Sequence, residues 1–288
     1  MKIALVAHKF PPASVGGVEI YTHNLAHSLS AQGHHVSVFY RDDAEDVDFR
    51  EGWQMTSPFH LWRVGRAFNA SQADPARLFF DTFLNRDVER SFQRFLADVQ
   101  PEFVHFQHLM SLSVRLPEFV QQMGIPMLLT LHDYWFRCAN SQLIWPDGRV
   151  CSGKLGGINC ARCATARAGS TMIKSIYPAL APLFQWRDWM VKRAAFRIGN
   201  FVSPSQFLRQ QYLELGFPSA RFSVLENGID VEHIRASPVL PKTDDLLRVT
   251  YLGSLAWQKG VHILVEAMRG LPPERIRLRV FWESQYLS

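Results

Sequence analysis

The dipeptide His132-Asp133 is the part of this sequence that most directly suggests chemistry. It follows Met127 to Leu131, an apolar run typical of a buried parallel strand. Because the carboxyl ends of strands in an open α/β sheet face the ligand crevice, an imidazole there can bind a sugar hydroxyl or a phosphate, and it titrates near neutral pH. The simpler alternative is that both residues only end the strand and cap a turn. Their position leads us to favour the functional interpretation.

Gly16 and Gly17 stand in a loop after the first predicted strand and directly before a helix. Backbone amides at a helix N-terminus that side chains do not shield can approach phosphate groups or sugar hydroxyls closely. A loop that needs positive φ would use glycine equally well. The sequence contains neither G-x-G-x-x-G nor G-x-x-x-x-G-K-[ST], so neither a nicotinamide enzyme nor a P-loop nucleotidase is supported.

Two further dipeptides lie near strand ends in the second half of the chain. Asn227-Gly228 follows the apolar run Phe222 to Leu225 and by itself indicates only a turn. Lys259-Gly260 precedes a predicted helix, where a lysine adds its charge to the positive end of the helix dipole and could clamp a diphosphate. An exposed surface lysine is the simpler interpretation of Lys259 taken alone.

All four cysteines lie in one glycine-bearing segment with the spacing C-x12-C-x8-C-x2-C: Cys138, Cys151, Cys160 and Cys163. Four thiolates suit a tetrahedral structural zinc, and the final C-x2-C is a normal ligand pair. Reduced thiols without a metal, a disulfide and an iron–sulfur cluster are the alternatives, because the wider spacings match no standard zinc finger. We expect a structural zinc that fastens the segment following His132.

Strand-like and helix-like segments alternate through most of the chain, which predicts an α/β fold with a Rossmann-like, doubly wound parallel sheet. The expected strands are Lys2 to Ala7, Val36 to Tyr40, Leu61 to Val64, Phe103 to Phe106, Met127 to Leu131, Phe201 to Ser203, Phe222 to Leu225, Leu247 to Leu252 and Ile276 to Phe281. The expected helices are Val18 to Leu29, a long one near Ala76 to Val99, Leu112 to Met123, Leu183 to Phe196, Phe207 to Leu215 and Val261 to Met268.

A polar, proline-containing stretch near residue 240 indicates a boundary between two domains. We expect a first domain over residues 1–236, with an irregular cysteine-bearing insertion at 137–165, and then a linker over 237–246. Residues 247–288 restart the strand–helix alternation as a second Rossmann-like domain. A doubly wound domain needs on the order of 100 residues, so this second domain is expected to be incomplete.

Composition limits the classes of function. The 288 residues are 47% hydrophobic and 20% charged, which argues against disorder as the main state. A net charge of +5 favours anionic partners, but no run of five basic residues indicates a nucleic-acid arm, so no nucleic-acid partner is expected. No secretory signal or transmembrane stretch is evident, which makes the cytoplasm the expected location.

The stretch from Tyr177 to Arg197 mixes aromatic residues with cations. Such a pattern is typical of a helix packed on a sheet with its cations in solvent, and equally of a helix at an anionic membrane surface. We favour the packed helix and keep peripheral contact with the inner face of a membrane as the alternative.

Five short motifs follow one another along the chain. They are Gly16-Gly17-Val18-Glu19, His132-Asp133-Tyr134-Trp135, Val202-Ser203-Pro204-Ser205, Glu226-Asn227-Gly228-Ile229-Asp230, and Tyr251-Leu252-Gly253-Ser254-Leu255 with Lys259-Gly260. In this order they resemble retaining glycosyltransferases of family four, which have the GT-B fold of two Rossmann-like domains. The resemblance covers nearly the whole chain and breaks off inside the donor-binding domain.

The resemblance implies transfer of a sugar from a nucleotide-diphosphate sugar to an acceptor hydroxyl, in the synthesis of a cell-surface polysaccharide or glycolipid. It places the carbohydrate or lipid-linked acceptor on the N-terminal domain and the donor on the C-terminal domain, and catalysis requires no cofactor. His132 would contact the transferred sugar, and Lys259 would neutralise the leaving diphosphate. The other substrate-binding residues implied by the motifs are Gly16, Gly17, Glu19, Asp133, Asn227 and Ser254.

Two departures from the family pattern bear on activity. Ser254 stands where the family often has an arginine, and the family's acidic donor motif would lie beyond residue 288. We therefore expect the 288-residue chain by itself to be inactive. The alternative function is a non-catalytic carbohydrate- or partner-binding module, fastened by zinc.

Overall fold

The computed structural model describes residues 1–42, 51–66, 73–167, 177–229, 231 and 244–282. The chain divides into two compact units, Met1–Asp230 and Val231–Ser288. Most of the linker expected at 237–246 lies outside the described residues.

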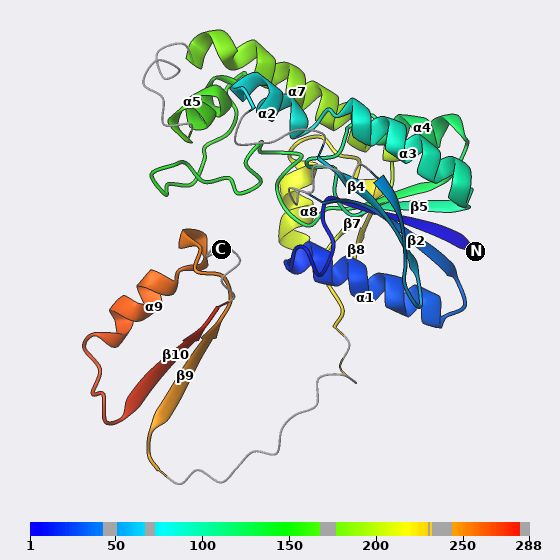
Figure 1. Ribbon diagram of the computed structural model, residues 1–288. Coiled ribbons are helices and arrows are strands. Elements are labelled where there is room, and N and C mark those ends of the chain that lie inside the picture. The colour runs from blue at the N-terminus through cyan, green and yellow to red at the C-terminus, as the bar shows by residue number, and fades with distance from the viewer. Residues whose placement is uncertain (43–50, 67–72, 168–176, 230, 232–243, 283–288) are drawn as a thin grey trace. The chain divides into compact units, whose positions relative to one another are not determined.

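The first unit is built on an eight-stranded sheet with the order β3-β4-β2-β1-β5-β6-β7-β8 (Figure 1). Its strands are β1 (Lys2–Ala7), β2 (His35–Asp42), β3 (Glu51–Met55), β4 (His60–Gly65), β5 (Phe103–Phe106), β6 (Met127–Thr130), β7 (Phe201–Ser203) and β8 (Phe222–Val224). All pairings are parallel except that of β3, an edge strand that pairs antiparallel with β4 and was not expected. The predicted α/β class with a mostly parallel sheet is confirmed.

The order of the strands contains a switch point beside β1. From β1 the chain moves outward to β2, β4 and β3, and then returns to pair β5 with the other side of β1. The connections of β1 and β5 therefore leave in opposite directions. In open α/β sheets, ligands bind outside the carboxyl ends of strands at such a point.

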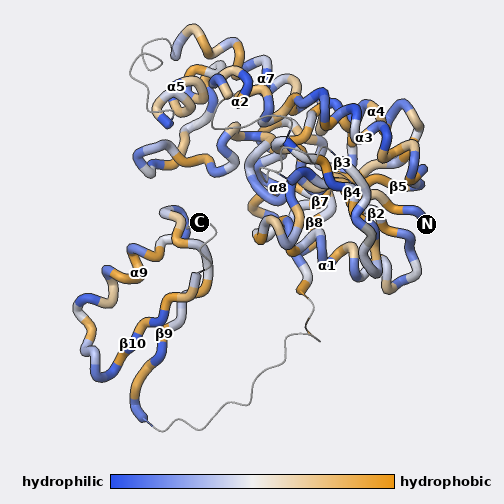
Figure 2. The backbone as a smooth tube through the Cα atoms, viewed as in Figure 1, coloured by the Kyte–Doolittle hydropathy of each residue, from blue (hydrophilic) through white to orange (hydrophobic). Residues whose placement is uncertain are grey.

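Side chains of the central strands alternate between two cores because successive residues of a strand point to opposite faces. On β1, Ala4 and Val6 belong to one core, and Ile3 and Leu5 belong to the other. Helix α1 (Gly17–Ala31) covers one face (Figure 1). The opposite face carries α3 (Arg86–Val99), α4 (Leu116–Gln122) and α7 (Tyr177–Ile198). Hydrophobic residues run through the central strands between these layers (Figure 2).

The prediction of a single long helix near residues 76–99 was wrong. The structure has α2 (Pro75–Asp81) and α3 (Arg86–Val99) instead. The Asn85 side chain accepts the backbone N–H groups of Asp87 and Val88, at 3.0 and 3.1 Å, and so starts a new helix. This polar cap starts a second helix where the apolar periodicity alone predicts one continuous helix.

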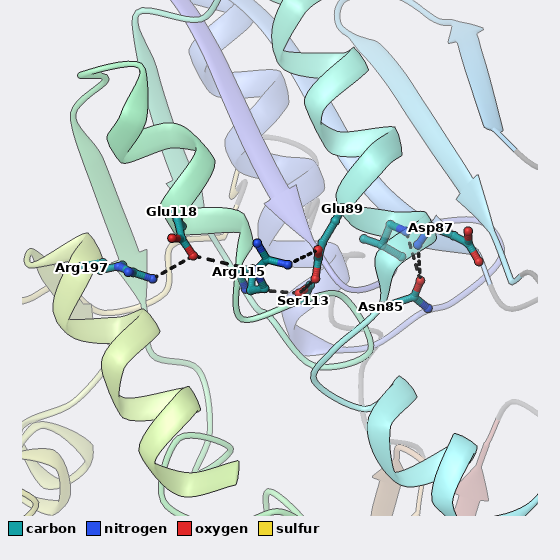
Figure 3. Close-up of polar contacts among 8 residues, drawn as sticks. Asn85, Asp87, Glu89, Ser113, Arg115, Glu118 and Arg197 are labelled. Carbon is teal, nitrogen blue, oxygen red and sulfur yellow. Dashed lines mark hydrogen bonds and ion pairs between the residues drawn. The ribbon is translucent and has the colours of Figure 1, made fainter. Parts of the chain in front are cut away.

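A chain of ion pairs joins the three helices on that face (Figure 3). The buried Glu89 carboxylate of α3 accepts hydrogen bonds from Ser113 Oγ at 2.7 Å and from Arg115 Nη1 at 3.1 Å. Glu118 of α4 (Leu116–Gln122) accepts from Arg197 Nη1 of α7 (Tyr177–Ile198) at 3.1 Å. The polar residues bordering the core thus fix how α3, α4 and α7 lie against one another.

Helix α7 packs on the sheet, which is the interpretation favoured for the stretch from Tyr177 to Arg197. Val191, Ala194 and Ile198 are buried in the core shared with the strands, whereas Trp189 is 53% exposed. Within the described part of the chain, no helix is both long enough and apolar enough to cross a membrane.

Residues 137–157 of the insertion contain no helix or strand, as expected, but α5 (Ile158–Arg167) begins in its last part, so the expectation of an irregular segment was wrong from residue 158. Helix α5 packs against α7. Gly157, just before it, has φ +87°, and a Cβ there would collide with the carbonyl oxygen of Ala181. The close approach of the two backbones requires this glycine.

The second unit contains β9 (Leu247–Leu252), α9 (Val261–Met268) and β10 (Ile276–Phe281), at the bounds that the sequence predicts. The two strands pair in parallel, with Leu247 opposite Ile276. Hydrophobic and hydrophilic residues alternate along both strands (Figure 2). No residue between 244 and 282 is buried.

Candidate functional site

Polar side chains from three neighbouring strands meet at the carboxyl edge of the first unit's sheet. His8 follows β1, His108 follows β5, and Asp133 follows β6. The rings of His8 and His108 lie 4.6 Å apart between centroids, and His108 Nε2 lies 3.1 Å from Asp133 Oδ2. His8 is 8% exposed and His108 is 2% exposed. The three side chains therefore form one cluster at the switch point.

The hydrogen bonds of His108 identify its tautomer. Its Nδ1 accepts the backbone N–H of Met110 at 2.9 Å, so Nε2 carries a proton and donates a hydrogen bond to the Asp133 carboxylate. Burial raises the pKa of Asp133, but the charge and hydrogen bond of His108 and the Trp135 backbone N–H more than offset this, so the net shift is downward. Asp133 is thus held as a carboxylate.

Asp133 is also positioned through its backbone and its second oxygen. Its Oδ1 accepts the N–H of Trp135 at 2.7 Å, which makes a tight turn after the strand. Its carbonyl oxygen accepts a hydrogen bond from the hydroxyl of Tyr212, at 2.6 Å. Tyr212 belongs to α8 (Gln206–Leu213) and is fully buried. Asp133 thus ends the strand in a turn and also belongs to the polar cluster.

His132 is half-buried and is oriented by Gln107. Its Nε2 lies 2.9 Å from Gln107 Oε1, an acceptor, so Nε2 carries the proton and Nδ1 keeps the free lone pair. Burial, and then the charge of His108, lowers the pKa of His132 to about 4, against a smaller opposing contribution from Asp133. At neutral pH the ring is an uncharged hydrogen-bond acceptor at Nδ1.

The loop before α1 reaches the same cluster. Glu19 is buried, its Oε1 accepts from Ser14 Oγ at 3.2 Å, and it lies 3.7 Å from His8 Nε2. The Tyr21 ring meets the His132 ring edge-on, with centroids 5.0 Å apart. The amino-terminal end of α1 and the strand end at His132 therefore share one edge of the sheet.

The two glycines of this loop have different steric roles, and neither has positive φ. A Cβ on Gly16 would lie 2.5 Å from Glu19 Oε2, whereas a Cβ on Gly17 would meet nothing within 4 Å. Gly16 therefore makes room for the Glu19 carboxylate. It precedes α1 without a side-chain cap, which leaves first-turn backbone amides unblocked by side chains. The alternative explanation of these glycines, a loop that needs positive φ, was wrong.

Two buried polar atoms of the cluster lack a protein partner. His8 Nδ1 and Gln107 Nε2 have no hydrogen-bond partner among the described residues, although Gln107 is fully buried. Buried polar atoms are nearly always paired, so these two atoms in one cluster suggest a site completed by water or a ligand.

Other sequence-predicted residues follow the last strand of the first unit or belong to the second unit. Asn227 is exposed after β8, two strands beyond β6 in the sheet. Ser254 and Lys259 belong to the second unit. There the Tyr251 hydroxyl donates to the Ser254 carbonyl at 2.7 Å, and Lys259 stands next to Gly260, whose φ of +71° begins α9. The predicted placement of Lys259 before a helix is correct.

His8, Gln107, His108 and Tyr21 were missed by reasoning from the sequence. A usable signal was present for three of them, because His8 directly follows the predicted strand Lys2 to Ala7, and Gln107 and His108 directly follow Phe103 to Phe106. Tyr21 lies within the predicted helix Val18 to Leu29, where no sequence signal sets it apart.

The four cysteines are free thiols, each partly exposed. Among the described residues, no group of three or more histidine, cysteine or acidic side chains stands ready to hold a metal ion. The zinc expected from the cysteine spacing is therefore not seen as a formed site.

Comparison with known proteins identifies the family. The family model described as Glycosyltransferase Family 4 matches residues 15–233. The chain belongs to this family. The matched range contains the α1 loop, His132-Asp133 and Asn227, so the motif-based resemblance is confirmed at the level of the family.

The similar proteins are longer than this chain. An uncharacterized 42.6 kDa protein in the cps region of Klebsiella pneumoniae is 22% identical over 267 residues, covering 90% of this chain and 63% of that protein. HepE of Anabaena, solved with UDP and glucose, has a TM-score of 0.51 at 13% identity, over 97% of this chain and 60% of that one. The lipopolysaccharide outer core galactosyltransferase WaaB has a TM-score of 0.51 at 13% sequence identity, over 99% of this chain and 62% of that one. These structural likenesses establish the fold.

Proposed function

We propose that this chain is the acceptor-side part of a retaining glycosyltransferase that moves a sugar from a nucleotide-diphosphate sugar to an acceptor hydroxyl. One observation carries the proposal: in a member of Glycosyltransferase Family 4, the uncapped start of α1 and His132 meet at the switch point of the sheet. This is where an open α/β sheet binds its ligands. The binding of UDP by HepE supports the donor class.

His132 is proposed to contact the transferred sugar. With Nε2 donating to Gln107 and its pKa lowered to about 4, the ring offers Nδ1 as an acceptor for a sugar hydroxyl. The unpaired Gln107 amide and His8 Nδ1 are further groups for hydroxyl or water contacts. Asp133, held ionised by His108, contributes a fixed negative charge beside a sugar that becomes electron-deficient in the transition state.

The backbone amides at Gly16 and Gly17 are proposed to contact substrate in the first unit. Lys259 of the second unit is proposed to neutralise the charge that grows on the leaving group. The leaving phosphate itself takes the acceptor proton, so this chemistry requires no cofactor. Asn227 and Ser254 complete the proposed substrate contacts.

We propose a carbohydrate or lipid-linked acceptor and a role in making a cell-surface polysaccharide or glycolipid. The relative in the cps region of Klebsiella pneumoniae and the outer core galactosyltransferase among the structural relatives support this assignment. A cytoplasmic location suits a nucleotide-sugar donor.

We also propose peripheral contact with an anionic membrane through α7. The exposed Trp189 ring has the Arg193 guanidinium 5.1 Å from its centre, and the Phe196 ring, 41% exposed, has Lys192 Nζ at 5.3 Å. Aromatic rings flanked by cations suit the interface of an anionic bilayer. Co-sedimentation with phosphatidylglycerol vesicles but not with phosphatidylcholine vesicles is the expected result, and equal recovery with both would oppose it.

The experiment that tests the transferase assignment uses the product of the whole reading frame. UDP-, GDP- and ADP-sugars are screened by thermal shift, because a ligand at 100 times its Kd stabilises the fold by about 2.7 kcal/mol. Transfer or hydrolysis of the donor that binds is then measured for the parent, for His132→Ala and for the control His35→Ala, which removes an exposed imidazole. We expect His132→Ala alone to lose at least tenfold in rate.

Three outcomes oppose parts of this proposal. Stabilisation without any turnover would favour the carbohydrate-binding module, and full activity of His132→Ala would remove His132 from the site. The 288-residue chain by itself is proposed to be inactive, since it spans only about three fifths of its matched relatives. Sugar transfer by that polypeptide alone would refute this last point.

A further inference from the structure

Residues 144–150 of the insertion form a tight loop, called here the 144–150 loop. Its two ends, Ile144 and Val150, are joined by an antiparallel bridge, and within it the Trp145 N–H donates to the Arg149 carbonyl at 2.8 Å. Arg167 Nη2, at the end of α5, donates to the Ile144 carbonyl at 2.9 Å. The loop is therefore closed on itself and is also attached to α5.

A pocket of about 560 Å³ lies between the 144–150 loop and α5. Trp145 lines it from the loop, and Asn159, Arg162 and Ala166 line it from the helix. Because these helical residues are spaced by three and four positions, they lie on one side of α5. Small-molecule sites in proteins typically enclose about 300–1,000 Å³, so this pocket is large enough for a ligand of that class.

The charged residues that line the pocket leave one cation over. The Asp147 carboxylate accepts hydrogen bonds from Arg149 Nε at 2.9 Å and from Arg149 Nη2 at 2.7 Å, so these two charges neutralise each other. The Arg162 guanidinium lies 5.6 Å from the centre of the Trp145 ring. Among the described residues no carboxylate forms an ion pair with Arg162. The pocket is therefore positively charged.

The hydrogen-bonding groups of the pocket suit an acidic sugar. A cation–π contact with Trp145 holds the Arg162 guanidinium without supplying an acceptor to its N–H groups, which can then bind a carboxylate or a phosphate in a bidentate manner. Asn159 Nδ2 donates to the Gly153 carbonyl at 2.7 Å, which leaves Asn159 Oδ1 to accept from a hydroxyl. The pocket thus combines a site for an anion with an acceptor for a hydroxyl group.

The segment that builds this pocket starts at the histidine cluster. The Tyr134 N–H, directly after Asp133, donates to the Ser141 carbonyl at 3.4 Å. Ser141 Oγ in turn donates to Met110 Sδ at 3.7 Å, and the Met110 N–H donates to His108 Nδ1 at 2.9 Å. The base of the insertion is therefore connected by hydrogen bonds to a side chain of the cluster.

We propose that the pocket between the 144–150 loop and α5 binds an anionic saccharide, whose carboxylate or phosphate pairs with Arg162. The inference rests on the proposed function, because the acceptor of a transferase is the molecule that would bring a saccharide to this unit. The acceptor is then an acidic glycan. Since His132 and the other side chains of the cluster do not line the pocket, it holds a sugar of the acceptor other than the one that is glycosylated.

The test measures binding by the 288-residue chain, so it requires no turnover. An array of oligosaccharides that carry a uronate, a pyruvate ketal or a phosphate is screened, each beside a neutral counterpart in which the acid is esterified or absent. The tightest probe and its counterpart are then titrated by isothermal titration calorimetry. We expect the anionic probe to bind about tenfold more tightly or better, because charge-assisted hydrogen bonds would be lost with the neutral one.

Two variants locate the binding. Arg162→Gln removes an exposed guanidinium, so the fold should tolerate it, and it should weaken binding of the anionic probe by about tenfold or more. Arg90→Gln removes the same charge from an exposed position on α3, outside the pocket, and should leave the affinity unchanged. Equal affinity for charged and neutral probes, unchanged affinity in Arg162→Gln, or no binding tighter than a Kd of about 1 mM across the array would overturn the proposal.

A separate measurement distinguishes failure of this inference from failure of the proposed function. For the product of the whole reading frame, the thermal shift caused by the nucleotide-sugar donor should be the same in Arg162→Gln and in the parent. Donor binding and sugar transfer that Arg162→Gln leaves unaltered, with no preference for acidic acceptors, would refute only the pocket. Absence of both donor binding and transfer would refute the transferase, and the affinity of the 288-residue chain for the anionic probe would still decide what the pocket binds.

Discussion

His105 provides a quantitative test of the electrostatics behind the site. It lies on β5, is 8% exposed, and its Nε2 is 2.8 Å from Thr130 Oγ1 on β6. Burial, and then the charge of His132, lowers its pKa to about 3. The perturbation is His105→Gln, which removes the titrating ring and retains an amide able to bond Thr130.

The sign follows from comparing folded and unfolded chains. An unfolded histidine has a pKa of about 6.5, so below that pH the unfolded chain binds a proton that folded His105 refuses. The free energy of unfolding therefore falls as the pH drops from about 6.5 towards 3, and is unaffected at higher pH. Between about pH 6 and pH 5 this one group contributes about 1 kcal/mol of loss, since a full proton would be worth about 1.4 kcal/mol per pH unit. His132, with its pKa of about 4, adds a similar amount.

Urea unfolding at both pH values measures the effect. The parent should lose about 2 kcal/mol from His105 and His132 together, and His105→Gln should lose about 1 kcal/mol less than the parent over the same interval. His35→Gln, which removes an exposed imidazole at the start of β2, controls for the loss of a histidine as such. An unchanged pH dependence in His105→Gln would show that this imidazole is not held neutral, and the description of the buried histidines would then be wrong.

Three further substitutions probe the supports of the site. Tyr212→Phe removes the 2.6 Å hydrogen bond to the Asp133 carbonyl. Because the carbonyl is left unpaired, the free energy of unfolding measured in urea titrations should fall by about 1–3 kcal/mol. An unchanged free energy of unfolding would mean that this bond is unimportant for stability. Gly16→Ala should displace the Glu19 carboxylate and lower the free energy of unfolding by on the order of 1 kcal/mol. Gly17→Ala, with nothing within 4 Å of its new Cβ, should stabilise α1 or leave it unchanged. Equal losses of stability in the two variants would contradict the steric account.

Much of the sheet was predictable because its strands are continuous apolar runs. β1, β5 and β7 have the bounds that the sequence predicts, as buried parallel strands should. β9 and β10 of the second unit also have the predicted bounds, although polar and apolar residues alternate along them. Edge strand β3 was missed because Glu51, Gly52 and Gln54 give it no apolar run. Helix α5 was missed because glycines and cysteines obscure its periodicity.

The candidate site was predictable only in part. His132, Asp133 and the glycine loop were found from their positions after strands, but the partners of His132 depend on strand order. Gln107 and His8 become neighbours of the β6 end only because β1, β5 and β6 are adjacent in the sheet, which periodicity does not reveal. Arg187 contacts Trp135 from a helix 52 residues later in the sequence, and only the folded chain shows it.

The hydrogen-bond ladder of the sheet continues into the residues of the cluster. The Gln107 N–H donates to the Val6 carbonyl at 2.8 Å, and the Leu131 N–H donates to the Val202 carbonyl at 2.8 Å. The strand ends that carry the cluster are thereby anchored to their neighbours before their loops begin. A loop beyond such an anchor can therefore change in length or composition while the cluster side chains keep their positions.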